Sequence, residues 1–122
     1  MPAHTYPLSH APTRATVDAL PGTTLLEFGA PWCPHCQAAQ PAIAQALQGR
    51  SDITHLQIEG GQGQALGRSF HVRLWPTLIV LQHGQELARV VRPATAQAVQ
   101  RILPLPGSCA RTAYSTRSFP LC

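Results

Sequence analysis

The sequence contains no lysine, so its nine basic residues are all arginines, and only 11% of its 122 residues are charged. The arginines are spread from Arg14 to Arg117 without forming a cluster. Nine basic against five acidic residues give a formal charge of +4. Because phosphate binding requires basic residues gathered on one face, this dispersion argues against nucleic acid as a partner.

Long apolar runs are also missing. No stretch approaches the roughly 18 apolar residues that a transmembrane helix requires, so we expect no membrane partner. Residues 1–22 are interrupted by Pro2, Pro7 and Pro12 and contain no continuous apolar core typical of a secretory signal. We therefore expect a cytoplasmic protein.

Internal repeats and low-complexity segments are absent as well, and 44% of the residues are hydrophobic. This length and composition predict one globular domain that buries a core of its own. We expect an N-terminal extension over residues 1–12 and the folded domain over residues 13–106. Residues 107–122 show no hydrophobic period, so we expect them to form a C-terminal tail.

Hydrophobic periodicity predicts alternating strands and helices. Apolar and β-branched runs predict four strands, over Thr23–Phe28, Ile53–Ile58, Thr77–Leu81 and Glu86–Val91. Helical spacing predicts helices over Pro34–Leu47 and Gln64–Phe70, and a last helix from a Thr95 cap to Leu103. Gly84 lies between the last two strands and predicts a β-hairpin. The expected fold class is therefore α/β, with helices on both faces of the sheet.

Four cysteines occur, and Cys33 and Cys36 are separated by only two residues, between a predicted strand and a predicted helix. The N–H groups and partial positive charge of a helix N-terminus favour a thiolate at Cys33. A thiolate attacks disulfides, and Cys36, one turn further on, can then attack the mixed disulfide. The spacing predicts a redox-active pair with Cys33 as nucleophile and Cys36 as resolving thiol.

Half of a zinc site is the alternative interpretation of this pair, in a non-catalytic module that binds a metal through the CXXC. It requires two more ligands, and the other two cysteines, Cys109 and Cys122, form no second CXXC. We expect no metal and no cofactor. In a cytosolic chain, we expect Cys109 and Cys122 to be free thiols. The alternatives are a disulfide between the two or a cap on the active site.

Three further features occur together with the CXXC. Trp32 directly precedes the first cysteine, Pro41 follows the second by five residues, and Pro76-Thr77 begins the next-to-last strand. With the segment EFGAPWCPHC at residues 27–36, these features resemble the thioredoxin superfamily over roughly residues 13–103. The resemblance implies a thioredoxin fold with a central mixed β-sheet.

The resemblance also implies a function. It implies a protein-disulfide oxidoreductase acting on protein thiols or disulfides, and the expected cytosolic location favours a reductase. Such a reductase would be recharged by another reductase or by glutathione. However, Pro34-His35 is similar to the dipeptide of DsbA-type oxidants, whereas thioredoxins carry Gly-Pro. An oxidant or isomerase therefore remains an alternative, and we expect Trp32, Pro34 and His35 to tune the redox properties of the pair.

Three more site residues follow from the resemblance. Pro76 is expected to be a cis-proline that faces the CXXC and shapes the substrate groove together with Trp75. Glu27 matches the buried acid that accepts the proton of the resolving cysteine. Because burying an ionised carboxylate is costly, the alternative is an outward-facing charge on the strand.

Four polar residues complete the predictions. His55 lies where similar proteins often have a lysine paired with the acid, so it is either a partner of Glu27 or a surface histidine. Arg92 lies where related chains have a glycine in the substrate loop. It either selects acidic partners or is a charge at the end of a strand. No role is assigned to His71 or His83.

Overall fold

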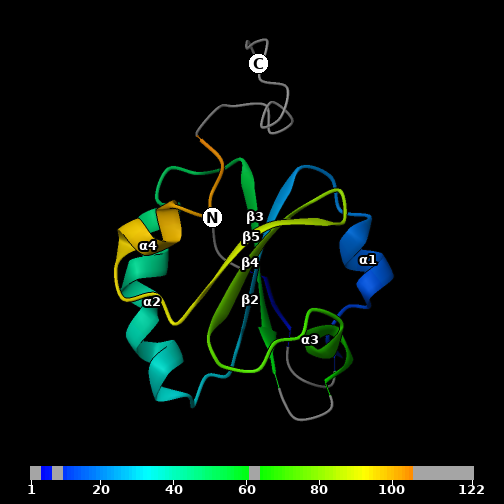
Figure 1. Cartoon of the computed structure of the whole chain (residues 1–122), viewed down its shortest axis with the longest axis horizontal. Helices are drawn as coiled ribbons and strands as arrows, with labels where there is room; N and C mark the ends of the chain where they lie inside the picture. Colours follow the sequence, from blue (N-terminus) through cyan, green and yellow to red (C-terminus); the bar gives the residue numbers. More distant parts are fainter. Residues whose placement is uncertain (1–3, 7–9, 61–63, 106–122) are drawn as a thin grey trace.

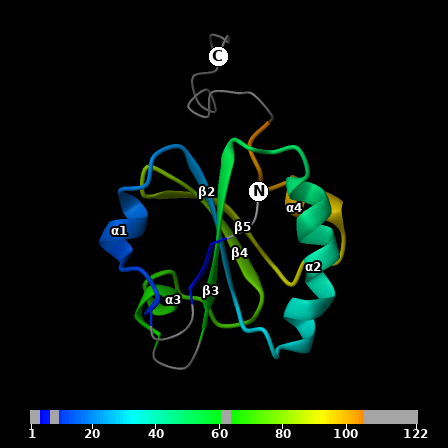
Figure 2. The same cartoon turned by 180° about the vertical axis from the view of Figure 1, so that it is seen from behind.

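A central β-sheet carries helices on both of its faces (Figures 1 and 2). The computed structural model describes residues 4–6, 10–60 and 64–105. In chain order the elements are β1 (His4–Tyr6), α1 (Arg14–Asp18), β2 (Thr23–Gly29), α2 (Pro34–Leu47), β3 (Ile53–Glu59), α3 (Ala65–Ser69), β4 (Thr77–Gln82), β5 (Gln85–Val91) and α4 (Ala96–Gln100). None of the helices in the described part of the chain has both the length and the apolar character that crossing a membrane requires.

The sheet has five strands in the order β1-β3-β2-β4-β5. Strand β3 is parallel to both β1 and β2, whereas β4 is antiparallel to both β2 and β5. Helices α2 and α4 cover one face, and α1 and α3 cover the other (Figures 1 and 2). The predicted α/β fold with a mixed sheet is therefore confirmed.

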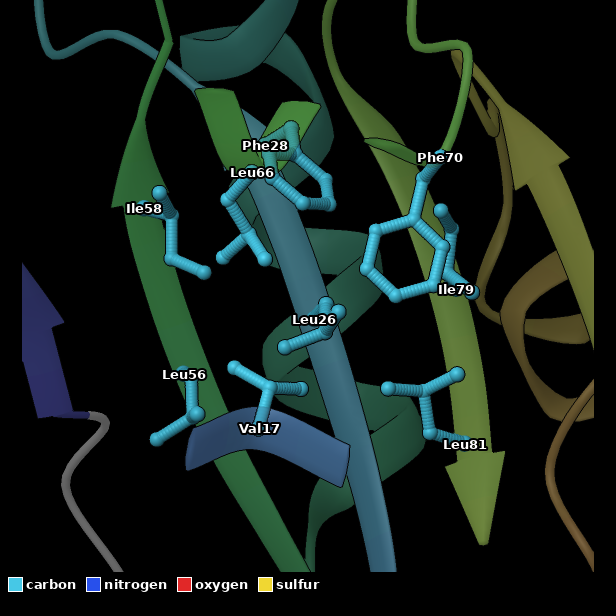
Figure 3. Packing of buried hydrophobic residues seen from close by; sticks show 9 residues of the cluster. All are labelled: Val17, Leu26, Phe28, Leu56, Ile58, Leu66, Phe70, Ile79 and Leu81. Carbon is cyan, nitrogen blue, oxygen red and sulfur yellow. The ribbon is translucent and has the colours of Figure 1, made fainter. Parts of the chain in front are cut away.

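Side chains of the central strand β2 alternate between the two faces, as the geometry of a strand requires. Leu26 and Phe28 pack with Val17 of α1 in one cluster (Figure 3). Leu25 packs in a second cluster that includes residues of α2 and α4. Glu27 has the same parity as Leu25, so its carboxylate points toward α2 instead of toward the apolar cluster of Figure 3.

Two short elements of the structure were not predicted from the sequence. Residues 1–12 were expected to form an extension, but His4–Tyr6 pairs with β3 as an edge strand. Helix α1 spans the five residues Arg14–Asp18 and is capped by Thr13, whose hydroxyl accepts a hydrogen bond from the N–H of Thr16 at 3.1 Å. A strand of three residues is too short to show an alternation, and α1 buries only Val17, so neither element produces a recognisable hydrophobic period. The last helix is also shorter than predicted, because α4 ends at Gln100.

The hairpin between β4 and β5 turns at His83 and Gly84, with φ angles of 51° and 82°. Two-residue hairpin turns with positive φ at both positions match the right-handed twist of the strands. Gly84 was predicted to supply this turn. His83 is exposed in this turn.

Candidate active site

Cys33 caps the N-terminus of α2 at the end of the sheet where β2 stops. Its Sγ atom accepts a hydrogen bond from the backbone N–H of Cys36 at 3.3 Å. Pro34 occupies the first turn of the helix, where its missing N–H leaves no hydrogen bond unmade. Both cysteines are free thiols and buried, with exposed fractions of 6% and 4%. The helix end thus places the two sulfur atoms side by side in the reduced form.

Burial by itself would raise the pKa of the Cys33 thiol. The hydrogen bond from the Cys36 thiol, the backbone N–H groups of Cys36 and His35, and the charge of Arg92 outweigh burial and hold this pKa below its ordinary value of 9.0. All of these groups stabilise negative charge on sulfur. Cys33 is therefore the thiol of the pair that ionises first.

The pKa of Cys36 shifts in the opposite direction. Burial, the hydrogen bond to Cys33, and the negative charges of Cys33 and Glu27 raise the pKa of Cys36 to about 12. Gly29 makes the close packing around this thiol possible, since a Cβ atom at Gly29 would lie 2.6 Å from the Cys36 Sγ. Cys36 therefore holds its proton at neutral pH, whereas the lowered pKa of Cys33 makes Cys33 the more readily ionised thiol.

Glu27 is 4% exposed and lies on the α2 side of the sheet, which excludes the outward-facing alternative. Its Oε1 atom accepts hydrogen bonds from His55 Nε2 at 2.7 Å and Gln57 Nε2 at 3.2 Å, and its Oε2 atom accepts one from Gln40 Nε2 at 2.7 Å. Burial raises the pKa of Glu27, but these hydrogen bonds and the charge of His55 outweigh it and leave the pKa below 4.5. The carboxylate is therefore ionised at neutral pH.

Strand register explains why these donors meet. On β3, His55 lies opposite Leu25 and Gln57 lies opposite Glu27. Both β3 side chains share the α2 face because they are two residues apart. The pairing of His55 with Glu27, which the sequence left open, is thus present in the structure.

Sequence reasoning missed two members of this network, Gln40 and Gln57. Gln40 comes from α2, and its Nε2 atom also donates to the backbone oxygen of Cys36 at 3.1 Å. The alternation of His55 and Gln57 along β3 could have placed Gln57 on the correct face. Neutral amides carry no charge pattern, however, so nothing in the sequence connects Gln40 with Glu27.

A cavity of about 250 Å³ lies beside the resolving thiol. Glu27, Cys36, Gln40 and Gln57 all line it, and the wall is otherwise largely apolar. A cavity of this size with polar partners can hold several water molecules. The buried carboxylate and the buried thiol therefore line one cavity that is large enough for water to relay a proton between them.

The aromatic side of the site is formed by two tryptophans. Trp75 precedes Pro76 in a cis peptide bond, as predicted, and packs against the buried cluster of Ala30, Cys33 and Cys36. The ring of Trp32 meets the ring of Trp75 edge-on at a centroid distance of 5.6 Å, and Trp32 is 65% exposed. Gly60 permits this arrangement, because a Cβ atom there would lie 2.8 Å from the Trp75 ring.

Several predicted residues lie apart from this arrangement. His35 is exposed, and its contribution to Cys33 is its backbone N–H. His71 is exposed in a turn after α3, consistent with the absence of a role. Cys109 and Cys122 lie outside the described residues. Within the described ranges, no group of three or more His, Cys, Asp or Glu side chains could hold a metal ion.

Comparisons with known proteins agree with the fold. The family model "Thioredoxin" matches residues 7–104, so the chain belongs to the thioredoxin family of thiol-disulfide oxidoreductases. The solved structure of thioredoxin 2 from Pseudomonas aeruginosa PAO1 in its reduced form is 50% identical, with a TM-score of 0.67. The match covers 75% of this chain and 84% of that one.

Two curated relatives are longer proteins. A thioredoxin domain-containing protein of Theileria parva is 34% identical over 60% of this chain, and protein disulfide-isomerase 1 of Caenorhabditis elegans is 32% identical over 75%. The matches span 34% and 20% of those proteins. The chain therefore corresponds to one part of each.

Proposed function

We propose that this protein reduces disulfide bonds in other proteins, with Cys33 as the nucleophile and Cys36 as the resolving thiol. The observation that carries the proposal is that the pKa values of two thiols on one helical turn shift in opposite directions. The pKa of Cys33 is lowered, whereas the pKa of Cys36 is raised to about 12. One sulfur is thereby prepared for attack, and the other is held protonated until the mixed disulfide has formed.

In the first step, the Cys33 thiolate attacks one sulfur of a substrate disulfide. A bond forms between Cys33 Sγ and that sulfur, and the substrate S–S bond breaks. The electron pair leaves with the second substrate sulfur, which takes up a proton from solvent. Cys33 is then neutral, so its negative charge no longer raises the pKa of Cys36.

In the second step, Cys36 loses its proton and attacks Cys33 Sγ. The bond between Cys33 Sγ and the attacked substrate sulfur breaks. That sulfur leaves as a thiolate and takes up a proton from solvent, and the two cysteines of the protein end as a disulfide. Glu27 is the proposed proton acceptor, since it is ionised and lines the same cavity as Cys36. The proton crosses that cavity to the carboxylate.

Substrate binding is assigned to Trp75, which packs against the cluster that contains both cysteines, and to the adjacent Pro76. The exposed Trp32 ring extends this apolar surface around the nucleophile. Pro34 begins the helix whose N-terminus stabilises the thiolate, and the N–H of His35 adds to it. Trp32, Pro34 and His35 are accordingly proposed to tune the redox properties of Cys33.

A cytoplasmic reductase needs a source of electrons, and we propose a partner reductase or glutathione for this step. The 50% identity to a thioredoxin supports the reducing direction. A DsbA-like oxidant or isomerase is the second candidate, supported by the lowered pKa of Cys33. A stabilised thiolate favours the dithiol form of the protein and so makes the couple more oxidising.

The proposal is tested by following the reduction of insulin disulfides with a chemical reductant as the electron source. We expect the natural chain to accelerate the reaction and Cys33→Ser to abolish the acceleration. Cys36→Ser should accumulate mixed disulfides through Cys33. Equal activity of the natural chain and the Cys33→Ser variant would contradict the proposal and indicate a non-catalytic module. Equilibration with glutathione then gives the reduction potential, and a value near that of protein oxidants would favour the second candidate.

A further inference from the structure

Arg92 is held at the edge of the active site by two hydrogen bonds to the cis-proline segment. Its backbone N–H donates to the oxygen of Pro76 at 2.9 Å. Its side-chain Nε donates to the oxygen of Trp75 at 2.8 Å. These contacts fix one edge of the guanidinium beside the two residues that we assign to substrate binding.

The backbone at Arg92 is one that glycine would adopt more easily, because its φ angle is 52°. A non-glycine side chain in this left-handed region is destabilising, because its Cβ crowds the backbone. The local turn therefore does not explain an arginine at this position. Its side chain makes no contact that the core requires, since Arg92 is exposed.

The rest of the guanidinium remains available. Among the residues that the structure describes, none accepts a hydrogen bond from Nη1 or Nη2 of Arg92, and no carboxylate forms an ion pair with it. The charge of Arg92 acts on the Cys33 thiolate, so the guanidinium lies within electrostatic reach of the nucleophile. Val91, 41% exposed, adds apolar surface beside it.

We propose that Arg92 is a specificity-determining residue that binds a carboxylate in the substrate, so that the protein prefers disulfides flanked by aspartate or glutamate. This inference rests on the proposed function. Within the described ranges the two terminal nitrogens of this guanidinium are unbound, and they present parallel donors that match a carboxylate. Because Nε already donates to the backbone oxygen of Trp75, the guanidinium of Arg92 is oriented before the substrate binds. The ligand is therefore an acidic segment of a protein beside its disulfide.

The test uses three peptide disulfides that are identical except for one residue next to the cysteine, which is glutamate, glutamine or lysine. We expect the natural chain to have a kcat/KM roughly two- to fivefold higher for the glutamate peptide than for the glutamine peptide, as an exposed ion pair provides. The lysine peptide should be the slowest. The preference should shrink as salt is raised, because screening weakens exposed charge pairs.

Two substitutions at Arg92 separate recognition from a structural role. Arg92→Gln should remove the ranking of the three peptides, and Arg92→Glu should reverse it. Each variant is normalised to its own rate with the glutamine peptide, which cancels any change in the reactivity of Cys33. Arg101→Gln is the matched control, because Arg101 is also exposed but caps α4, beside the half of α2 that lies away from Cys33 (Figures 1 and 2).

The outcomes distinguish this inference from the proposed function. If the natural chain reduces the glutamine peptide in a Cys33-dependent way but shows no preference for glutamate, the inference is wrong and the function stands. A preference that persists in Arg92→Gln would also overturn it. If the natural chain reduces none of the peptides, the proposed function itself fails. Reversal in Arg92→Glu with an unchanged ranking in Arg101→Gln supports the assignment.

Discussion

His55 Nε2 lies 2.7 Å from Oε1 of Glu27, inside the layer between the sheet and α2. Both side chains are nearly buried, with 12% and 5% of their surfaces exposed. The carboxylate is the acceptor in this contact, so the imidazole carries a proton on Nε2. This pair, together with Gln40 and Gln57, keeps a buried acid charged beside the resolving thiol.

Removing the imidazole should raise the pKa of Glu27. Burial alone raises this pKa, and the hydrogen bond and charge of His55 are among the causes that outweigh burial. We expect the order natural chain, His55→Gln, His55→Leu, with His55→Leu the highest, because glutamine keeps a donor without the charge. Carbon NMR of the Glu27 side chain against pH measures the shift. An unchanged pKa in His55→Leu would show that burial and the two glutamines alone set it.

Acid should weaken the fold through Glu27. The pKa of Glu27 is lower in the folded protein than its ordinary 4.5, so its ionised form contributes stability above about pH 4.5. This contribution is lost as the pH falls through the folded pKa. Glu27→Gln lacks it, and we expect the variant to be roughly 1–3 kcal/mol less stable near neutral pH. The difference in unfolding free energy should narrow from pH 6 to pH 3 in urea titrations.

Asp52 and Glu86 also have lowered pKa values, from ion pairs with Arg50 and Arg89. Both pairs are present in the natural chain and in Glu27→Gln, so their effects cancel in the difference. A stability gap that stays constant from pH 6 to pH 3 would assign the loss to packing of the amide instead of to the charge of Glu27.

Alkylation should distinguish the two thiols at neutral pH. Only thiolates react quickly, so a limiting amount of iodoacetamide should label Cys33 and leave Cys36 unmodified. In Cys33→Ser, the pKa of Cys36 should fall below about 12, because the charge of Cys33 and its hydrogen bond are lost. Peptide mass mapping against pH follows both sites. Preferential labelling of Cys36 in the natural chain would reverse the assigned roles.

The sequence was sufficient for the parts of the site that depend on local spacing. A CXXC between a strand and a helix places Cys33 at the helix cap. The burial of Glu27 was implied only by the resemblance to the thioredoxin superfamily, because an outward-facing charge fitted the strand equally well. The network around Glu27 depends on the register between β2 and β3 and on the rotation of α2. Neither is encoded in a local pattern, so Gln40 and Gln57 could not be assigned from the sequence.

Glycine at position 29 should be required for resolution. A Cβ atom there would lie 2.6 Å from the Cys36 Sγ, so Gly29→Ala must displace the resolving thiol. We expect a loss of roughly 1–3 kcal/mol in stability and a longer-lived mixed disulfide with substrate. Gly67→Ala is the control, because its Cβ would meet no atom closer than 3.4 Å. Thermal unfolding and non-reducing gels measure the two effects. Rapid resolution in Gly29→Ala would mean that Cys36 moves freely.

The dipeptide between the cysteines offers a test of how the thiolate is stabilised. The contribution of His35 to Cys33 in the structure is its backbone N–H, while the imidazole is exposed. Proline has no N–H, so the double variant Pro34→Gly, His35→Pro removes this donor along with the ring. His35→Ala removes only the imidazole. The two variants therefore separate the backbone contribution from the side-chain contribution.

We expect the double variant to raise the pKa of Cys33 and to make the couple more reducing, because its dithiol form loses part of the stabilisation of the thiolate. At a pH above the pKa of Cys33 in both the natural chain and the double variant, a difference of one unit between these two pKa values corresponds to about 30 mV of reduction potential for a two-electron couple. Thiolate absorbance against pH gives the pKa, and equilibration with glutathione gives the potential. His35→Ala should lie close to the natural chain if the backbone N–H dominates. A shift in His35→Ala as large as that of the double variant would assign the effect to the imidazole. A double variant more oxidising than the natural chain would contradict both explanations.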